Sequence, residues 1–324
     1  MNVLIFGGTG FVGLNIADVL LSRGHAVTLF DRAGLPPAAQ RAFRRHGDRL
    51  TMVLGDILDR AAVDAAIAGG IDAIVLGAAI TADAERDAAD PESILQVNLM
   101  AQTPILVAAK RHGVRRVINL SSAGAYGAAA FRHALLDEEL TCDPQSLYAI
   151  TKFASEKVAA RLAALWSMDI VSVRLSGVFG PWERATGVRD TLSPQMQIID
   201  ALHAGREAVL PRAGVKDSIY APDVADAIAL LLEAARPQHR LYNISTGVEW
   251  SALQWGEALA ALNPGFVCRL AAPGEAPNVN LHSAADRAPL AVTRLAEEFG
   301  WRARFGCADS AADLQDWSQH QEGN

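Results

Sequence analysis

The chain has 324 residues, enough for about two domains, and its 51% apolar and 20% charged residues are typical of a globular protein. The net charge is −7 and no lysine- or arginine-rich run stands out, which argues against a nucleic-acid surface. The three cysteines are widely spaced and suit a reducing compartment, and no apolar run is long enough to span a membrane. We expect a cytoplasmic protein that binds neither nucleic acid, membrane nor metal.

The first half of the chain alternates short apolar runs with longer helical patterns. Strands are expected at 3–6, 26–30, 51–54, 73–76, 117–120 and 170–175. Helices are expected at 11–23, 91–112 and 145–166. Strands that alternate with helices indicate βαβ units, so the fold class is α/β with a Rossmann-type doubly wound parallel sheet.

After Gly177 the pattern changes, and glycines, prolines and charges crowd into residues 180–194. A helix is expected at 195–203, followed by a return to the sheet through 218–220, 223–235 and 241–244. Short helices are expected near 251–262, 290–299 and 311–317. We therefore expect a Rossmann domain over 1–177 and 218–248, and a smaller discontinuous substrate domain over 178–217 and 249–324.

A glycine-rich turn joins the first expected strand to the first helix. Gly7, Gly10 and Gly13 have the spacing G-x-x-G-x-x-G. Phe11 and Val12, between the second and third of these glycines, begin the expected helix. The glycines allow a tight turn, close approach of a pyrophosphate and close packing of helix on strand. The helix N-terminus presents free N–H groups to phosphates. This turn predicts a dinucleotide site.

Asp31 ends the second strand, where a carboxylate can accept hydrogen bonds from adenosine ribose hydroxyls and would repel the extra phosphate of NADP. It favours NAD. Arg32 beside it could hold a 2′-phosphate, so NADP is not excluded.

Two further pairs follow the next strands. Asp56 and Ile57 come after the third strand, where they either cover the adenine or, for Asp56, cap a helix. Ala78 and Ala79 follow the fourth strand, and their small side chains leave room for a ribose.

Tyr148 and Lys152 are four residues apart on an expected helix, so they share one face, and Ser122 lies just past the fifth strand. A free tyrosine has a pKa near ~10, but an adjacent ammonium lowers it. The phenolate can then take a proton from a substrate hydroxyl while hydride leaves the same carbon, and Ser122 holds the substrate oxygen.

With these motifs the chain resembles the extended short-chain dehydrogenase/reductases, the NAD-dependent epimerase/dehydratase group. The matching segments, in the family's order, are 7–13, 119–127, 146–152, 174–181, 219–225 and 242–247. The resemblance implies that Ser122, Tyr148 and Lys152 are the catalytic residues. It also implies that Asn98 supports the active site, that Leu175 lies against the nicotinamide, and that the helices at 91–112 and 145–166 form a homodimer.

Some positions depart from the family pattern. The family's 4,6-dehydratases carry an Asp-Glu pair where this chain has Ala123 and Gly124, which disfavours dehydration. Members that bind nucleotide-diphosphate sugars usually have an Asn where Gly177 stands and an Arg where Lys216 stands. A further family arginine is missing from the turn at 272–275. Because arginine suits bidentate phosphate recognition, a pyrophosphate-bearing sugar is less expected.

The loop after residue 180 offers other groups for a small-molecule substrate. Trp182 could form an apolar wall, and Arg184 and Arg189 could bind a carboxylate or phosphate; alternatively the loop is an exposed, charged segment with a buried tryptophan.

Three functions stay open. The first is an NAD-dependent dehydrogenase that oxidises a secondary hydroxyl of a sugar, sugar acid or hydroxy acid. The second is an NAD-dependent sugar or nucleotide-sugar epimerase, and the third a dinucleotide-sensing regulator.

Overall fold

A computed structural model describes residues 1–322 of the chain. Its central element is one parallel β-sheet. Its seven strands lie in the order β11-β6-β5-β4-β1-β2-β3. Their bounds are β1 Asn2–Phe6, β2 Ala26–Asp31, β3 Leu50–Leu54, β4 Ala73–Leu76, β5 Arg116–Ser122, β6 Asp169–Leu175 and β11 Leu241–Ile244. The order reverses between β1 and β4, as in a doubly wound fold. The expected fold class is confirmed.

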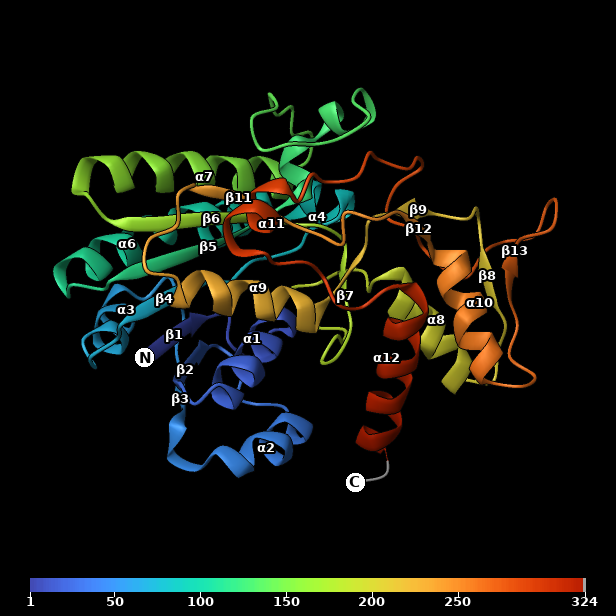
Figure 1. The fold of residues 1–324 in the computed structure, drawn as a ribbon, viewed down its shortest axis with the longest axis horizontal. Helices are drawn as coiled ribbons and strands as arrows, with labels where there is room; N and C mark the ends of the chain where they lie inside the picture. Colours follow the sequence, from blue (N-terminus) through green and yellow to red (C-terminus); the bar gives the residue numbers. More distant parts are fainter. Residues whose placement is uncertain (323–324) are drawn as a thin grey trace.

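Helices cover both faces of the sheet (Figure 1). One face packs against α1 (Phe11–Ser22), α9 (Ala221–Glu233) and α11 (Thr293–Phe299). The other face packs against α3 (Arg60–Ile67), α6 (Gln102–Arg111) and α7 (Leu147–Trp166). Burial on both faces explains why β1 and β4 read as continuous apolar runs, with Val3–Phe6 fully buried.

The helix expected at 91–112 is interrupted. The structure has α5 (Pro91–Leu95), a π-helical turn (Gln96–Met100) and then α6. Asn98 is buried within the π-helical turn. Such π-bulges often mark functional positions because they redirect a side chain.

The expected return to the sheet through 218–220 is wrong. The two-residue strand β10 (Ile219–Tyr220) pairs with β7 (Val178–Phe179), outside the main sheet. It leads directly into α9, and β11 alone rejoins the sheet by pairing with β6. A run of two residues has no periodicity from which its partner can be read.

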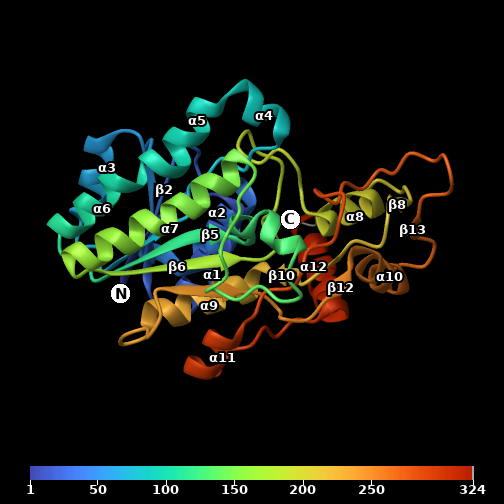
Figure 2. The ribbon, with the colours of Figure 1, turned by 90° about the horizontal axis from the view of Figure 1, so that it is seen from above.

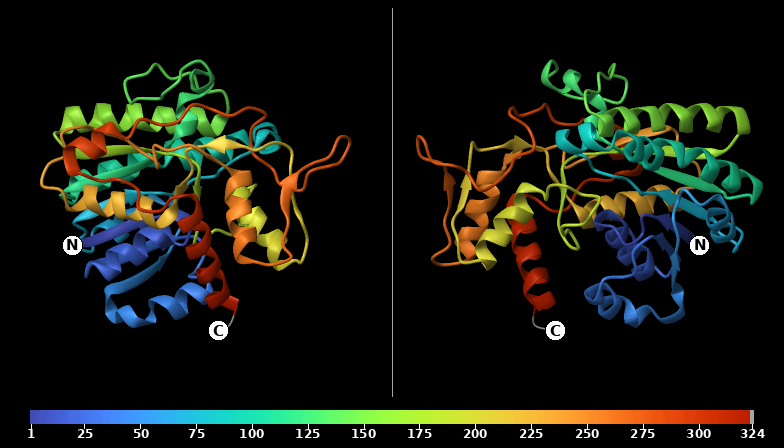
Figure 3. Two further views of the ribbon diagram at one scale, coloured as in Figure 1. Left: turned by 45° about the vertical axis from the view of Figure 1, so that its right-hand side comes forward. Right: turned by 180° about the vertical axis from the view of Figure 1, so that it is seen from behind.

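A further hydrophobic cluster lies at the opposite end of the molecule from α3 and α6 (Figure 2). It is built from α8 (Pro194–His203), β8 (Ala208–Leu210), α10 (Ala252–Leu262), β13 (Cys268–Leu270) and α12 (Cys307–Glu322). In Figure 3 α12, drawn in red, forms the side of this part that faces the Rossmann part. Leu295 and Trp301 pack into the core on the sheet instead, although the expectation assigned them to the substrate domain.

The remaining elements are short. They are α2 (Pro37–Phe43), α4 (Ala84–Ala89), the pair β9 (Val215–Lys216) and β12 (Trp250–Ser251), and the 3-10 turns 44–49, 123–126 and 128–131. Within residues 1–322 no helix has both the length and the apolar character needed to cross a membrane.

Candidate active site

A cleft of about 500 Å³ opens at the carboxyl ends of the central strands. The glycine-rich turn, Tyr148 and Lys152 line it on the Rossmann side, and Lys216 and His282 line it on the other. Its position at the switch point of strand order is where doubly wound folds bind ligands.

The glycine-rich turn is as tight as its sequence requires. A Cβ on Gly13 would stand 2.4 Å from the carbonyl oxygen of Gly7, and one on Gly7, whose φ is +77°, would stand 2.6 Å from the Ala78 nitrogen. α1 starts after Gly10 without a side-chain cap. The N–H groups of its first turn, including those of Phe11 and Val12, are thus available to an anion in the cleft. These features fit the pyrophosphate of a dinucleotide.

Asp31 faces the cleft and Arg32 does not. The Asp31 carboxylate accepts hydrogen bonds from the backbone nitrogens of Thr9 (3.1 Å) and Ala33 (3.3 Å). The Arg32 side chain is 60% exposed and lies 3.9 Å from Asp56. The acidic group at this edge therefore fits ribose hydroxyls better than a 2′-phosphate.

Asp56, Ile57, Ala78 and Asn98, which were also expected to bind the cofactor, lie outside the cleft lining. Asp56 accepts a hydrogen bond from the Leu58 nitrogen at 2.9 Å, so it stabilises a turn, and Ile57 is buried. Ala78 backs the glycine turn, whereas its neighbour Ala79 lines the cleft.

Asn98 connects the loop after β4 to α7, which carries Tyr148 and Lys152. Its side chain accepts from the Ile80 nitrogen (2.7 Å) and donates to the Ile80 oxygen (2.9 Å). The same amide donates to the Thr151 hydroxyl at 3.3 Å. Asn98 therefore acts on the site through the loop after β4 and through the residue before Lys152.

Ser122, Tyr148 and Lys152 meet in the cleft. Ser146 caps the N-terminus of α7. Tyr148 and Lys152 follow in that helix one turn apart, and the Lys152 Nζ lies 5.8 Å from the centre of the Tyr148 ring. Burial raises the pKa of Tyr148, while the Ser122 hydroxyl and Arg189 lower it. Burial lowers the pKa of Lys152 to about 8, and Glu156 opposes that shift. Lys152 donates to the Leu120 oxygen at 2.8 Å.

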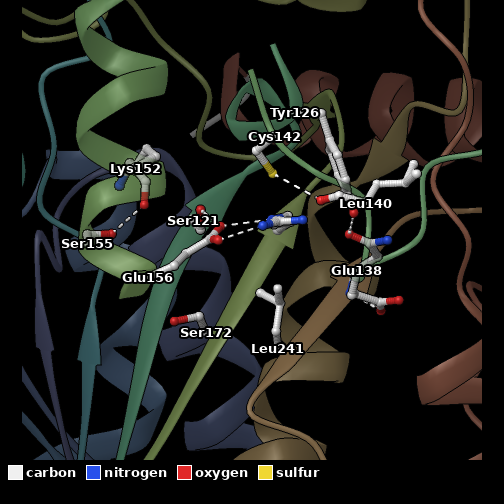
Figure 4. A network of polar contacts seen from close by, with 12 residues as sticks. Ser121, Tyr126, Glu138, Leu140, Cys142, Lys152, Ser155, Glu156, Ser172 and Leu241 are labelled. Atoms are coloured by element: carbon white, nitrogen blue, oxygen red, sulfur yellow. Dashed lines mark hydrogen bonds and ion pairs between the residues drawn. The ribbon is translucent and has the colours of Figure 1, made fainter. Parts of the chain in front are cut away.

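Sequence reasoning missed a buried ion pair between α7 and β6. Figure 4 shows Glu156 of this pair beside Ser121. Glu156 accepts two hydrogen bonds from Arg174, at 2.9 and 2.7 Å, and one from Ser121 at 2.5 Å. Glu156 is four residues after Lys152, so helical spacing could have pointed to it. Its partner on β6 could be found only in the fold.

The loop after β7 is divided among different roles. Trp182 does not line the cleft but packs against Phe43 and Trp317, with ring centres 5.7 and 5.1 Å apart. Arg184 lines the cleft and donates to the Thr9 oxygen at 2.8 Å. Arg189 lines it too, but its charge is paired with the buried Glu183 at 2.5 Å.

The far end of the cleft is cationic around Lys216. Its stem fills the space that Gly177 leaves, since a Cβ there would stand 3.0 Å from the Lys216 Cδ. Burial and, to a lesser extent, the nearby Arg287 lower the pKa of Lys216 to about 8. Arg287 pairs with Asp217 at 2.7 Å and Arg212 pairs with Asp286. Among the described residues Lys216 has no such partner.

His282 completes this end. Its φ is 64° and its Nε2 lies 2.8 Å from the Leu192 oxygen. Burial lowers its pKa to about 4, so the ring is neutral near pH 7. Arg287 and His282 were missed from the sequence because nothing local distinguishes them from surface residues.

Comparisons with known proteins agree with this architecture. Residues 3–245 match the model of the NAD dependent epimerase/dehydratase family. The chain is 27% identical to a UDP-glucose 4-epimerase of Mycolicibacterium smegmatis over 317 residues, covering 96% of each chain. It is 30% identical over 244 residues to a dTDP-glucose 4,6-dehydratase of the same organism, covering 72% of this chain and 69% of the relative.

A solved structure of UDP-glucose 4-epimerase from Stenotrophomonas maltophila, with bound NAD and formylated UDP-arabinopyranose, has the same fold. It superposes with a TM-score of 0.83 at 26% identity and covers 100% of this chain and 99% of that one.

Proposed function

Because this chain belongs to the NAD-dependent epimerase/dehydratase family, and is thus an enzyme of the extended short-chain dehydrogenase/reductase type, we propose that it epimerises an anionic sugar derivative. The cofactor is NAD, for which Asp31 at the cleft edge is suited. The observation that carries the proposal is that one cleft joins the glycine-rich turn, the Ser122–Tyr148–Lys152 group and the unpaired Lys216.

The proposed chemistry centres on Tyr148. NAD, when bound, accepts hydride from a carbon that carries a hydroxyl. Lys152 and Arg189 favour the phenolate form of Tyr148, which takes the hydroxyl proton as general base. Ser122 holds the same oxygen by a hydrogen bond. In epimerisation Tyr148 returns the proton once the carbon has been reduced from its other face.

The substrate proposed is an anion because the far end of the cleft has a surplus cation. Arg212 and Arg287 each have a carboxylate partner, whereas Lys216 has none in residues 1–322. Burying an unpaired ammonium is costly, and a bound phosphate or carboxylate would offset that cost. The M. smegmatis relative named as acting on UDP-glucose supports a nucleotide-activated sugar.

A net dehydrogenase is the second candidate. It is favoured by Gly177 and Lys216, which replace the family's asparagine and arginine and leave a lysine as a point charge that suits a carboxylate as well as a phosphate. Dehydration is not proposed, because Ala123 and Gly124 provide no acid or base beside Ser122.

The ultraviolet spectrum of the purified enzyme, with NAD and panels of UDP-sugars and free sugar acids, tests the proposal. An isomerised UDP-sugar without lasting NADH absorbance supports epimerisation. Steady growth of NADH absorbance with a free acid supports the dehydrogenase and refutes the epimerase.

We extend the proposal to domains and assembly. Residues 1–177 and 218–248 bind the cofactor, and 178–217 and 249–324 contribute most substrate contacts. The faces of α6 and α7 form a homodimer, for which the exposed Val107, Ile150 and Leu165 provide apolar surface. Sedimentation that finds only monomer at micromolar concentration would refute the dimer.

A further inference from the structure

The segment Pro181–Asp190, here named the strap, crosses the cleft and is tied down on both sides. On the α1 side Asn15 donates to the Pro181 oxygen at 2.7 Å. On the α4 side the Thr81 nitrogen donates to the Val188 oxygen at 2.8 Å, and Arg86 donates to the Gly187 oxygen at 2.9 Å. The strap therefore connects α1, which follows the glycine-rich turn, to α4 and the loop before it.

Trp182 anchors the strap in an unusual conformation. Its φ is 68°, in the left-handed region that a bulky side chain rarely adopts, and it is 6% exposed between Phe43 and Trp317. A strained residue persists only where its surroundings hold it, and such residues gather at ligand clamps. The anchor fixes the direction in which the next residues leave toward the cleft.

Arg184, two residues after this anchor, reaches back over the glycine-rich turn. Its guanidinium donates to the oxygens of Thr9 (2.8 Å) and Trp182 (3.3 Å). Burial lowers the pKa of Arg184, and attraction to Asp31 opposes the shift. Within residues 1–322 no carboxylate pairs with it, in contrast to Arg189, which pairs with Glu183.

An arginine whose hydrogen bonds go only to carbonyl oxygens keeps its full charge, and here that charge lies beside the uncapped start of α1. Both features favour an anion at the same point. The contact with Thr9 places Arg184 beside the glycine-rich turn, which favours a role toward the dinucleotide over one toward the substrate.

We propose that Arg184 binds a phosphate of the dinucleotide and that the strap must open before the cofactor leaves. This inference rests on the proposed function, since it requires NAD in the cleft. It implies that NADH dissociates faster once the contacts that hold the strap are weakened.

The test measures the dissociation of NADH directly, by the loss of protein-enhanced NADH fluorescence when excess NAD is added, and the Kd of NAD by calorimetry. Arg184→Met removes the charge and keeps most of the length. Arg86→Met loosens the strap at its α4 side without touching the glycine-rich turn. Arg45→Met, whose side chain is 65% exposed, is the matched control.

We expect Arg184→Met to weaken NAD binding about ten- to a hundredfold, the loss typical of a charge-assisted hydrogen bond. Arg86→Met should speed NADH dissociation, and Arg45→Met should change neither quantity. If Arg184→Met does not fold by circular dichroism, Arg184→Lys keeps the charge but shortens the reach, and an intermediate loss of affinity is expected.

If NADH dissociates from both Arg184→Met and Arg86→Met at the wild-type rate, the strap does not control cofactor release and the proposal is refuted. It is also refuted if both Arg184→Lys and Arg184→Met bind NAD with wild-type affinity. Failure of the wild-type chain to bind NAD at all would instead refute the proposed function. The two failures are thus distinguishable.

Discussion

Replacing Glu156 with glutamine tests whether the buried ion pair between α7 and β6 holds α7 on the sheet. The Glu156 and Arg174 side chains are 4% and 1% exposed, and the Arg174 guanidinium also lies 4.4 Å from the centre of the Tyr126 ring. Glu156→Gln keeps the shape of the side chain but removes its charge. Arg174 then remains buried without a counterion.

The expected loss follows from this geometry. Glutamine can accept one of the two Arg174 hydrogen bonds, and the other, with its charge assistance, is lost. Breaking a buried ion pair by removing one partner typically lowers the free energy of unfolding by about 3–5 kcal/mol. Replacing both residues, as Glu156→Met with Arg174→Met, removes the stranded charge and should cost less than Glu156→Gln alone.

Urea unfolding followed by far-ultraviolet circular dichroism measures these differences. Glu233→Gln is the control, because it breaks the Arg23–Glu233 pair, whose side chains are 31% and 35% exposed. Exposed pairs contribute about 1 kcal/mol or less. If Glu156→Gln costs no more than Glu233→Gln, the reasoning from burial is refuted.

The same variant should change the pH dependence of catalysis. Glu156 raises the pKa of Lys152 against the lowering by burial, which leaves it at about 8. Without the carboxylate that pKa falls, so Lys152 loses its proton at lower pH. The alkaline limb of the kcat profile is expected to move toward acid; a limb at the wild-type pH would show that Glu156 acts on stability alone.

Three further changes have definite outcomes. Tyr148→Phe should lower kcat by about a hundred- to ten-thousandfold and leave the affinity for NAD unchanged. A kcat of this variant close to that of the wild type would exclude Tyr148 as the general base. The Lys216 pKa of about 8 predicts that KM for an anionic substrate rises about tenfold per pH unit above it, whereas Lys216→Arg should stay flat to pH 10. Gly13→Ala places a Cβ 2.4 Å from the Gly7 oxygen and should abolish NAD binding by calorimetry; Gly34→Ala, with no atom within 4 Å, is the control.

The residues that sequence reasoning found are those whose patterns are local. Alternating apolar runs and helices predict a parallel sheet, and seven parallel strands are present. The G-x-x-G-x-x-G spacing encodes a turn that no side chain fits, and the four-residue spacing of Tyr148 and Lys152 encodes one helix face. Backbone geometry over a few residues carries this information, so no distant partner is needed to read it.

What only the tertiary structure decided is how side chains are partnered. Arg184 and Arg189 look alike in the sequence, yet Arg189 is paired with Glu183 while Arg184 crosses to Thr9, 175 residues away. Arg287 reaches Ser176 over 111 residues. The free charge of a cation depends on which carboxylates the fold brings near it. That is why the sequence by itself predicted which residues gather in this cleft, but only the fold showed which of its cations lack a carboxylate partner within residues 1–322.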